Sequence, residues 1–340
     1  MGAALILARI LAEPGQALSL DAAGWTALLT VARAENLFGT LAWRLTGLPA
    51  PERVAPILAD ARGWAEEQRR SALWEAEMVR RALTPLGVPV ILLKGTAYAA
   101  AGLKAGQGRS IGDLDLLVPR ARLDAVEAAL IARGWEWVKP DPYDDVYYRR
   151  WMHELPPLIH RERDRMADVH HTILPLTARP TPDPEALIAN AVPLSANGEG
   201  GLSVLAPADM IVHAAAHLFA DGDLAGGLRN LWDIHCLIDE FGVDGLEARA
   251  ALHGLRSQVL RAARQAHTLF GTEIPLAWQG WDSADPLFRR RLLARDGWGR
   301  AMRPLTRLGF YARSHWLRMP PGMLARHLWI KWRRGASAPE

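Results

Sequence analysis

The sequence predicts an α+β fold, in which a core of strands and helices is flanked by helical regions on both sides. Three observations support this prediction. Residues 1–84 show the apolar spacing of helices, residues 85–205 alternate strand-like and helical segments, and residues 206–340 return to helical spacing. We therefore predict an N-terminal helical region, a central α+β core and a C-terminal helical region with these boundaries.

The N-terminal region is typical of a series of helices. Ser19-Leu20-Asp21 is a candidate cap for a helix that ends at Arg33, residues 36–45 continue the helical pattern, and a long helix is predicted over 52–83. The apolar run near the N-terminus is too short to span a bilayer, and it lacks the features of a signal peptide. On the long helix, charged residues are expected to face solvent: Glu66, Glu67, Arg69, Arg70, Glu75 and Glu77.

The central region begins with a short apolar run that has proline and glycine at its boundaries, as expected for a buried strand. A break follows, and then a segment whose residues alternate with the period of two of a strand. Strands are predicted over 88–93, 113–118, 135–139, 166–173 and at the sheet edge over 202–205, with a hairpin from 146–151 and 157–161. Helices are predicted over 120–133 and 184–190, and residues 140–145 are predicted to form a loop.

The C-terminal region is predicted to contain helices over 208–220, 224–241, 245–270, 286–317 and 323–334. Its Cys236 is the only cysteine of the chain, so no disulfide can form within it. A reducing, cytoplasmic location is the simplest interpretation. We expect Cys236 to be a buried small apolar residue.

Charge is distributed unevenly along the chain. Residues 285–340 carry 13 Lys and Arg against 3 Asp and Glu, whereas residues 1–284 carry 27 against 34. Trp316, Trp329 and Trp332 lie among the basic residues of this tail. Such a pattern suits an anionic membrane surface or a nucleic acid. A solvated or docked terminal helix is the favoured interpretation, and the other stays open.

Three aspartates form the strongest candidate site. Alternation along 113–118 places Asp113 and Asp115 on one face of a strand, where the two carboxylates repel each other unless a cation lies between them. Mg²⁺ is the first candidate because it prefers oxygen ligands, and Mn²⁺ is an alternative. If strand 166–173 lies beside this strand, Asp168 joins the pair, as in sites that bind two metal ions. The alternative is an Asp pair that makes turns or salt bridges at a sheet edge.

The turn Lys94-Gly95-Thr96 is a candidate phosphate site. Gly95 allows the backbone to approach a phosphate closely, and a helix that starts near Thr96 would direct free N–H groups at the anion. Arg109 and Ser110 directly precede the Asp strand, and Arg109 is suited to hold a phosphate through two hydrogen bonds. Lys94 is a further candidate whose side-chain direction the sequence leaves open.

The segments LLKGT, RSIGDLDLLV and ADVHHT together resemble the polymerase β superfamily of nucleotidyltransferases. Within it they look like the bacterial family named uncharacterised nucleotidyltransferase. The resemblance implies a small mixed sheet backed by helices, with an NTP and Mg²⁺ in a cleft. It matches Gly95 and Thr96 to the phosphate contacts, Asp113 and Asp115 to the metal ligands, and Asp168 to the third carboxylate. This chain departs from the superfamily in having Thr96 and in the 16 residues that separate Thr96 from Asp113.

The leading hypothesis is therefore an Mg²⁺-dependent nucleotidyltransferase with two metal ions. It would move a nucleoside monophosphate from an NTP such as ATP to a hydroxyl or phosphate acceptor and release pyrophosphate. Asp168 is the candidate base. The acceptor is open between a small molecule, a sugar, a protein and an RNA end. Two alternatives are a non-catalytic nucleotide sensor or scaffold, and a defence or antitoxin-like enzyme that modifies a protein.

Several other residues are weaker candidates. His170 shares the predicted face of Asp168 and is either an acceptor or phosphate contact or a structural histidine, whereas His171 is expected to be structural. Arg229 and Asp233 lie four residues apart and form an intrahelical pair or reach the nucleotide. His213 and His217 have the same spacing, and packing or capping is favoured over metal binding because no HExxH pattern surrounds them.

Overall fold

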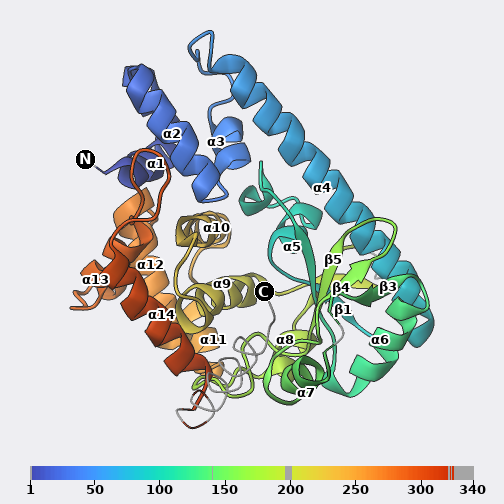
Figure 1. Cartoon of the computed structure of the whole chain (residues 1–340). Helices are drawn as coiled ribbons and strands as arrows, with labels where there is room; N and C mark the ends of the chain where they lie inside the picture. Colours follow the sequence, from blue (N-terminus) through green and yellow to red (C-terminus); the bar gives the residue numbers. More distant parts are fainter. Residues whose placement is uncertain (1, 140, 196–200, 321, 323, 325–340) are drawn as a thin grey trace, which may run out of the picture.

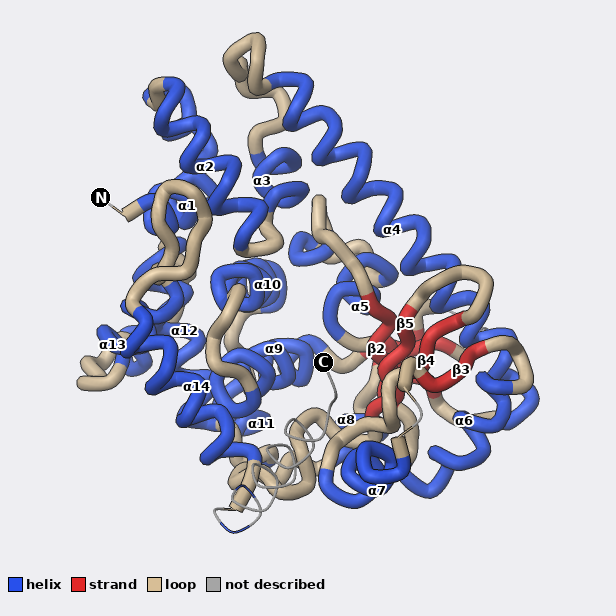
Figure 2. Tube along the Cα trace, in the orientation of Figure 1, coloured by secondary structure: helices blue, strands red, loops and turns tan. Residues whose placement is uncertain are grey.

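The computed structural model describes residues 2–139, 141–195, 201–320, 322 and 324. Its strands form a mixed sheet with the order β3-β4-β5-β2-β1-β7-β6. Figures 1 and 2 show this sheet on one side of the molecule, with helices around it. The strands are β1 (Val90–Leu92), β2 (Asp113–Leu117), β3 (Trp135–Trp137), β4 (Leu158–His160), β5 (Met166–His170), β6 (Val192–Pro193) and β7 (Leu202–Val204). The predicted α+β class is confirmed.

The N-terminal helices follow the predicted pattern closely. Asp21 caps the second helix by accepting a hydrogen bond of 2.7 Å from the Gly24 N–H. The long helix α4 packs against α6 and the sheet (Figure 1). The helices are α1 (Ala3–Ala12), α2 (Ala22–Ala34), α3 (Phe38–Arg44) and α4 (Ala55–Leu83).

One prediction on α4 was wrong. Glu75 is buried rather than solvated, because Arg163 donates two hydrogen bonds to it, at 2.7 and 2.9 Å. The other predicted surface charges of α4 form exposed pairs along the helix, such as Arg69 with Glu66 at 2.9 Å.

The core contains α5 (Lys94–Ala100), α6 (Leu123–Ile131), α7 (Pro142–Trp151) and α8 (Pro184–Ala189). The loop predicted over 140–145 was wrong from residue 142 on, and the hairpin that begins at 146 was wrong, since Pro142–Trp151 forms α7. Residue 140 lies outside the described residues. Arg149 on α7 donates hydrogen bonds to Asp145 at 2.7 Å and to Glu127 of α6 at 2.9 Å. This contact between two helices cannot be read from local alternation.

The predicted edge strand at 202–205 exists as β7, but it does not lie at the edge. It pairs in parallel with β1 and in antiparallel orientation with β6, which forms the edge instead. β6 contains only two residues, one of them Pro193, so its sequence carries no alternation.

The C-terminal helices are more broken than predicted. The expected helix over 245–270 is split near Gly254, whose positive φ of 66° ends a helical path. The expected helix over 286–317 is split by an irregular segment. The helices are α9 (Pro207–Ala216), α10 (Gly227–Phe241), α11 (Leu246–Leu252), α12 (Arg256–Phe270), α13 (Asp285–Leu292) and α14 (Pro304–Arg318).

Short turns of other helix types join these elements. A π-helical turn, His217–Asp221, continues α9. The 3₁₀ turns are Pro14–Ser19, Thr84–Leu86, Lys104–Gly106, Arg120–Arg122 and Leu276–Trp278. Trp316 on α14 is about half exposed, whereas Trp329 and Trp332 and almost all of the predicted helix 323–334 lie outside the described residues. Within the described ranges, no helix has the length and apolarity of a membrane span.

Residues 97–112, the long insert between Thr96 and Asp113, connect the helical regions on both sides of the core. Gly108 lies against Gly39 of α3, and a Cβ on Gly108 would come within 2.4 Å of the Gly39 carbonyl oxygen. On the other side, Lys104 pairs with Asp239 of α10 at 2.7 Å. The insert is therefore held by close backbone packing at Gly108 and by an ion pair at Lys104.

Gly108→Ala is expected to destabilise the protein, because the new Cβ would clash with backbone and because Gly108 has a positive φ of 63°. Gly102→Ala is the matched control, since Gly102 has a φ of 70° but open space around it. We expect Gly108→Ala to cost about 2 kcal/mol more than the control, which itself costs about 1 kcal/mol. Urea unfolding measures the difference, and equal costs would contradict the close packing.

Candidate active site

The parallel pairing of β2 with β5 brings the three aspartates together. Asp115 lies opposite Asp168 in the register, and Asp113 precedes Asp115 by two residues on the same face. One carboxylate oxygen from each of the three residues lies within 4.8 Å of the others. The predicted adjacency of these strands is confirmed.

Asp115 is the buried centre of this group. It accepts hydrogen bonds from Lys94 Nζ at 2.7 Å and from His170 Nε2 at 3.0 Å. Burial alone would raise the pKa of Asp115, but the Lys94 charge and the His170 hydrogen bond outweigh it and hold that pKa well below its usual range. Asp115 is therefore ionised in the folded protein.

The other two aspartates lack such compensation. Burial and repulsion from Asp115 raise the pKa of Asp113, and the same two causes, with Glu154, raise the pKa of Asp168 to about 7. Asp168 Oδ1 is buried and has no hydrogen-bond partner among the described residues. An uncompensated carboxylate oxygen beside two others is the donor set that a hard divalent cation prefers, so these residues fit Mg²⁺ or Mn²⁺.

Lys94 supplies the positive charge nearest to Asp115. It is the first residue of α5 and has a φ of 47°, a conformation that costs energy for a residue with a side chain. Burial lowers the pKa of Lys94, but the charge of Asp115 raises it by more, so the ammonium stays protonated. The side-chain direction that the sequence left open is therefore toward the aspartates.

A cleft of about 210 Å³ lies between Asp113 and Asp115 on one side and helices α9 and α10 on the other, and Asp168 is not among its lining residues. A Cβ on Gly95 would lie 2.5 Å from Arg109 Nε, so Gly95 leaves the space that Arg109 occupies. The lining residues are Lys94, Gly95, Tyr98, Arg109, Ser110, Ile111, Asp113, Asp115, His213, Ala214, His217, Asn230 and Asp233.

A buried chain of polar contacts crosses the back of the cleft. Arg109 pairs with Asp233 of α10, and Arg229 pairs with the same carboxylate from one turn away. Arg229 also donates a hydrogen bond of 2.5 Å to Thr40 of α3. Asp233 thus lines the cleft and holds Arg109 in place, whereas Arg229 lies in the layer behind it.

Some predicted contacts lie away from the cleft. The Thr96 hydroxyl is buried and donates a weak hydrogen bond of 3.4 Å to the Asp113 carbonyl, so it supports the Asp strand. His170 is buried against Asp115, and His171 and Cys236 are buried as expected. Helix α5 begins at Lys94, two residues before the predicted start.

Sequence reasoning missed or undervalued several residues of the site. His213 and His217 line the cleft although packing was favoured, and the four-residue spacing on one helix face was the available signal. Tyr98 and Asn230 also line it, and nothing in their local sequence indicates this. Glu154 contacts His170 at 3.5 Å, from a segment that was predicted to be part of a hairpin.

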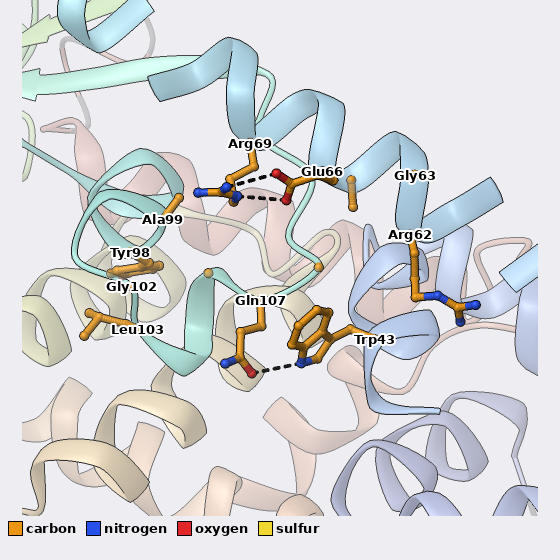
Figure 3. Close-up of a pocket in the computed structure, with 13 residues that line it drawn as sticks. Trp43, Arg62, Gly63, Glu66, Arg69, Tyr98, Ala99, Gly102, Leu103 and Gln107 are labelled. Carbon is orange, nitrogen blue, oxygen red and sulfur yellow. Dashed lines mark hydrogen bonds and ion pairs between the residues drawn. The ribbon is translucent and has the colours of Figure 1, made fainter. Parts of the chain in front are cut away.

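A larger cavity of about 530 Å³ adjoins the cleft and shares Tyr98 with it. Figure 3 shows this cavity between α4, α3 and the insert. Trp43 Nε1 donates a hydrogen bond of 3.0 Å to Gln107 Oε1, and Arg69 pairs with Glu66. The remaining lining residues include Arg62, Gly63, Ala65, Ala99, Gly102, Leu103, Gly106 and Gly108.

A comparison with protein families matches the part of the chain that contains this site. The profile of a family described as uncharacterised nucleotidyltransferase matches residues 21–271, which is well over half of the chain. The chain belongs to this family. A comparison with curated proteins found no match. The matched range contains the aspartate cluster, the cleft and the adjoining cavity.

Asp168→Asn is expected to stabilise the metal-free protein at pH 8 by about 1–2 kcal/mol, because it removes a buried, repelled charge. A carboxylate whose pKa is raised in the folded state lowers stability as pH rises from about 4 to about 7. The gain should therefore be larger at pH 8 than at pH 4.5.

Thermal unfolding in the presence of EDTA at the two pH values measures this difference. The same variant should lose most of the stabilisation that Mg²⁺ gives the wild type. If Asp168→Asn is less stable than the wild type in EDTA, by the same amount at both pH values, Asp168 is a well-paired structural carboxylate.

Proposed function

We propose that this protein is an Mg²⁺-dependent nucleotidyltransferase with a polymerase β-like core, and that it moves a nucleoside monophosphate from an NTP to an acceptor. The observation that carries the proposal is the convergence of Asp113, Asp115 and Asp168, whose oxygens lie within 4.8 Å of one another. The membership of the family supports the reaction class.

Asp113, Asp115 and Asp168 are the residues that we propose hold divalent ions. When bound, such ions would offset the negative charge of the polyphosphate and of the leaving pyrophosphate. The uncompensated Asp168 Oδ1 and the raised pKa of Asp113 support this assignment, since both carboxylates lack a positive partner such as Lys94 provides for Asp115.

The cleft supplies positive and hydrogen-bonding groups for the polyphosphate. Lys94 and Arg109 carry the charge, and Asp233 orients Arg109. In the proposed reaction an acceptor oxygen bonds to the α-phosphorus, the bond from that phosphorus to pyrophosphate breaks, and Asp168 takes the acceptor proton. The side chains act by holding the reactants in line and by excluding water.

The sizes of the two spaces suggest how the substrates divide between them. The cleft of about 210 Å³ is smaller than pockets that hold whole organic ligands, roughly 300–1,000 Å³, whereas the adjoining cavity of about 530 Å³ lies within that range. We assign the polyphosphate to the cleft and the organic part of a substrate to the cavity, where Trp43 and Tyr98 offer aromatic surface.

Transfer of labelled nucleotide tests the proposal. The wild type, incubated with α-labelled NTPs, Mg²⁺ and an extract of potential acceptors, should produce a labelled product. Asp113→Asn and Asp115→Asn should each reduce transfer by about 10²–10³-fold or more, because each removes a charge that faces the transition state. Asp60→Asn, an exposed carboxylate on α4, is the control and should leave transfer unchanged.

Two results would contradict this function. Label transfer that is equal in the Asp113 and Asp115 variants would place the reaction elsewhere. NTP binding without transfer in any extract would favour the alternative of a nucleotide sensor.

Gly63→Leu tests the cavity. Gly63 lies inside α4, and a Cβ there meets open space, so a leucine fills the cavity without a clash. The KM for one substrate, the NTP or the acceptor, should rise about tenfold, which corresponds to about 1.4 kcal/mol of lost binding.

Gly309→Leu on α14 is the control. A Cβ on Gly309 also meets open space, and Gly309 is not among the residues that line the cavity. Both variants should fold as stably as the wild type, because each replaces a glycine inside a helix. Unchanged KM values for both substrates would exclude the cavity from the reaction.

A further inference from the structure

A second group of metal-binding side chains lies beside the aspartates. It consists of His153, Glu154 and His170, whose ligand atoms all lie within 4.8 Å of one another. The backbone fixes this group. Glu154 forms an isolated antiparallel bridge with His170, and the His171 N–H donates a hydrogen bond of 2.8 Å to the His153 carbonyl. His170 is the last residue of β5, and the other two side chains project from the segment that is bridged to it.

The separations suit one small ion. Glu154 Oε2 lies 3.5 Å from His170 Nε2 and 3.8 Å from His153 Nε2. Zinc-type ions bind imidazole nitrogen and carboxylate oxygen at about 2.0–2.2 Å in tetrahedral geometry, which separates neighbouring ligand atoms by about 3.3–3.6 Å. Both distances are near this range, and both exceed a normal hydrogen bond. An ordinary hydrogen-bonded His–Glu–His group would be closer.

Burial makes the group costly without a ligand. The side chain of His170 is 2% exposed, that of His153 is 12% exposed and that of Glu154 is 17% exposed. The Nδ1 atoms of both histidines are buried and have no hydrogen-bond partner among the described residues. Polar groups left in this state usually cost about 1–3 kcal/mol each, so the fold retains these side chains at a cost to its own stability.

We propose that His153, Glu154 and His170 bind a divalent ion of the zinc class, separate from the Mg²⁺ of the aspartate cluster. Two imidazoles and one carboxylate favour such an ion over Mg²⁺, which prefers oxygen ligands alone. Three protein ligands leave a tetrahedral ion one position for water or a substrate group. The site adjoins the aspartates, because His170 Nε2 donates a hydrogen bond of 3.0 Å to Asp115 Oδ1 in the metal-free protein. Coordination of the ion through Nε2 would replace this hydrogen bond.

This site goes beyond the proposed function, since binding of the ion does not require nucleotide transfer. It would add a second positive centre at the end of the aspartate cluster, next to the unpartnered Asp168. An acceptor with an anionic or hydroxyl group is the class of substrate that such a centre attracts.

Co²⁺ is the probe, because its tetrahedral complexes absorb visible light more strongly than octahedral ones. In excess Mg²⁺, which is expected to occupy the aspartates, the full-length protein should bind one Co²⁺ with intense visible bands, and Zn²⁺ should displace it. His153→Gln and Glu154→Gln should each weaken Co²⁺ binding at least tenfold, whereas Asp113→Asn and His171→Gln, the neighbouring histidine, should retain it.

A measurement on the wild type covers the case in which a variant fails to fold. The proton NMR spectrum of the Co²⁺-bound protein should contain two strongly shifted, exchangeable signals, one from each Nδ1–H. The proposal is overturned by an octahedral Co²⁺ spectrum, by the absence of shifted imidazole signals, or by binding that Asp113→Asn abolishes and His153→Gln does not. Transfer measured with Mg²⁺ alone tests the proposed function separately.

Discussion

The parallel pairing of β2 with β5 is the constraint on which the site depends. It fixes Asp115 opposite Asp168 on the same face of the sheet, so the two carboxylates cannot separate without breaking the strand pair. Lys94 offsets the charge of Asp115 but leaves Asp168 uncompensated. The fold therefore maintains a local excess of negative charge, which a divalent cation relieves.

The helical regions matter because they complete the cleft around this charge. Arg109 of the insert, Asp233 of α10 and Thr40 of α3 belong to three distant parts of the chain, and Arg229 links the last two. Both arginines meet Asp233, although Arg109 Nε and Arg229 Nε have no hydrogen-bond partner among the described residues. The packing of the N-terminal and C-terminal helices against the insert thus determines where Arg109 points, and the cleft is a property of the whole fold.

The sequence was most informative where a local pattern decides the structure. Strand alternation placed Asp113 and Asp115 on one face, and the condition that the strand of Asp168 lies beside them is met. It was least informative where distant contacts decide. Arg163 buries Glu75 from 88 residues away, and the same dependence on distant partners made α7 unpredictable from local alternation. The positions of charged residues in space were therefore the main gain from the structure.

The central claim is that the three aspartates share a divalent cation. A crystal structure with Mn²⁺ and a non-hydrolysable NTP analogue tests it most directly, because the anomalous signal of Mn²⁺ locates the ion independently of any measurement of activity. The account predicts a strong anomalous peak in contact with oxygens of Asp113, Asp115 and Asp168, and triphosphate density beside Lys94. A peak elsewhere, with Asp168 still lacking a ligand, would contradict it.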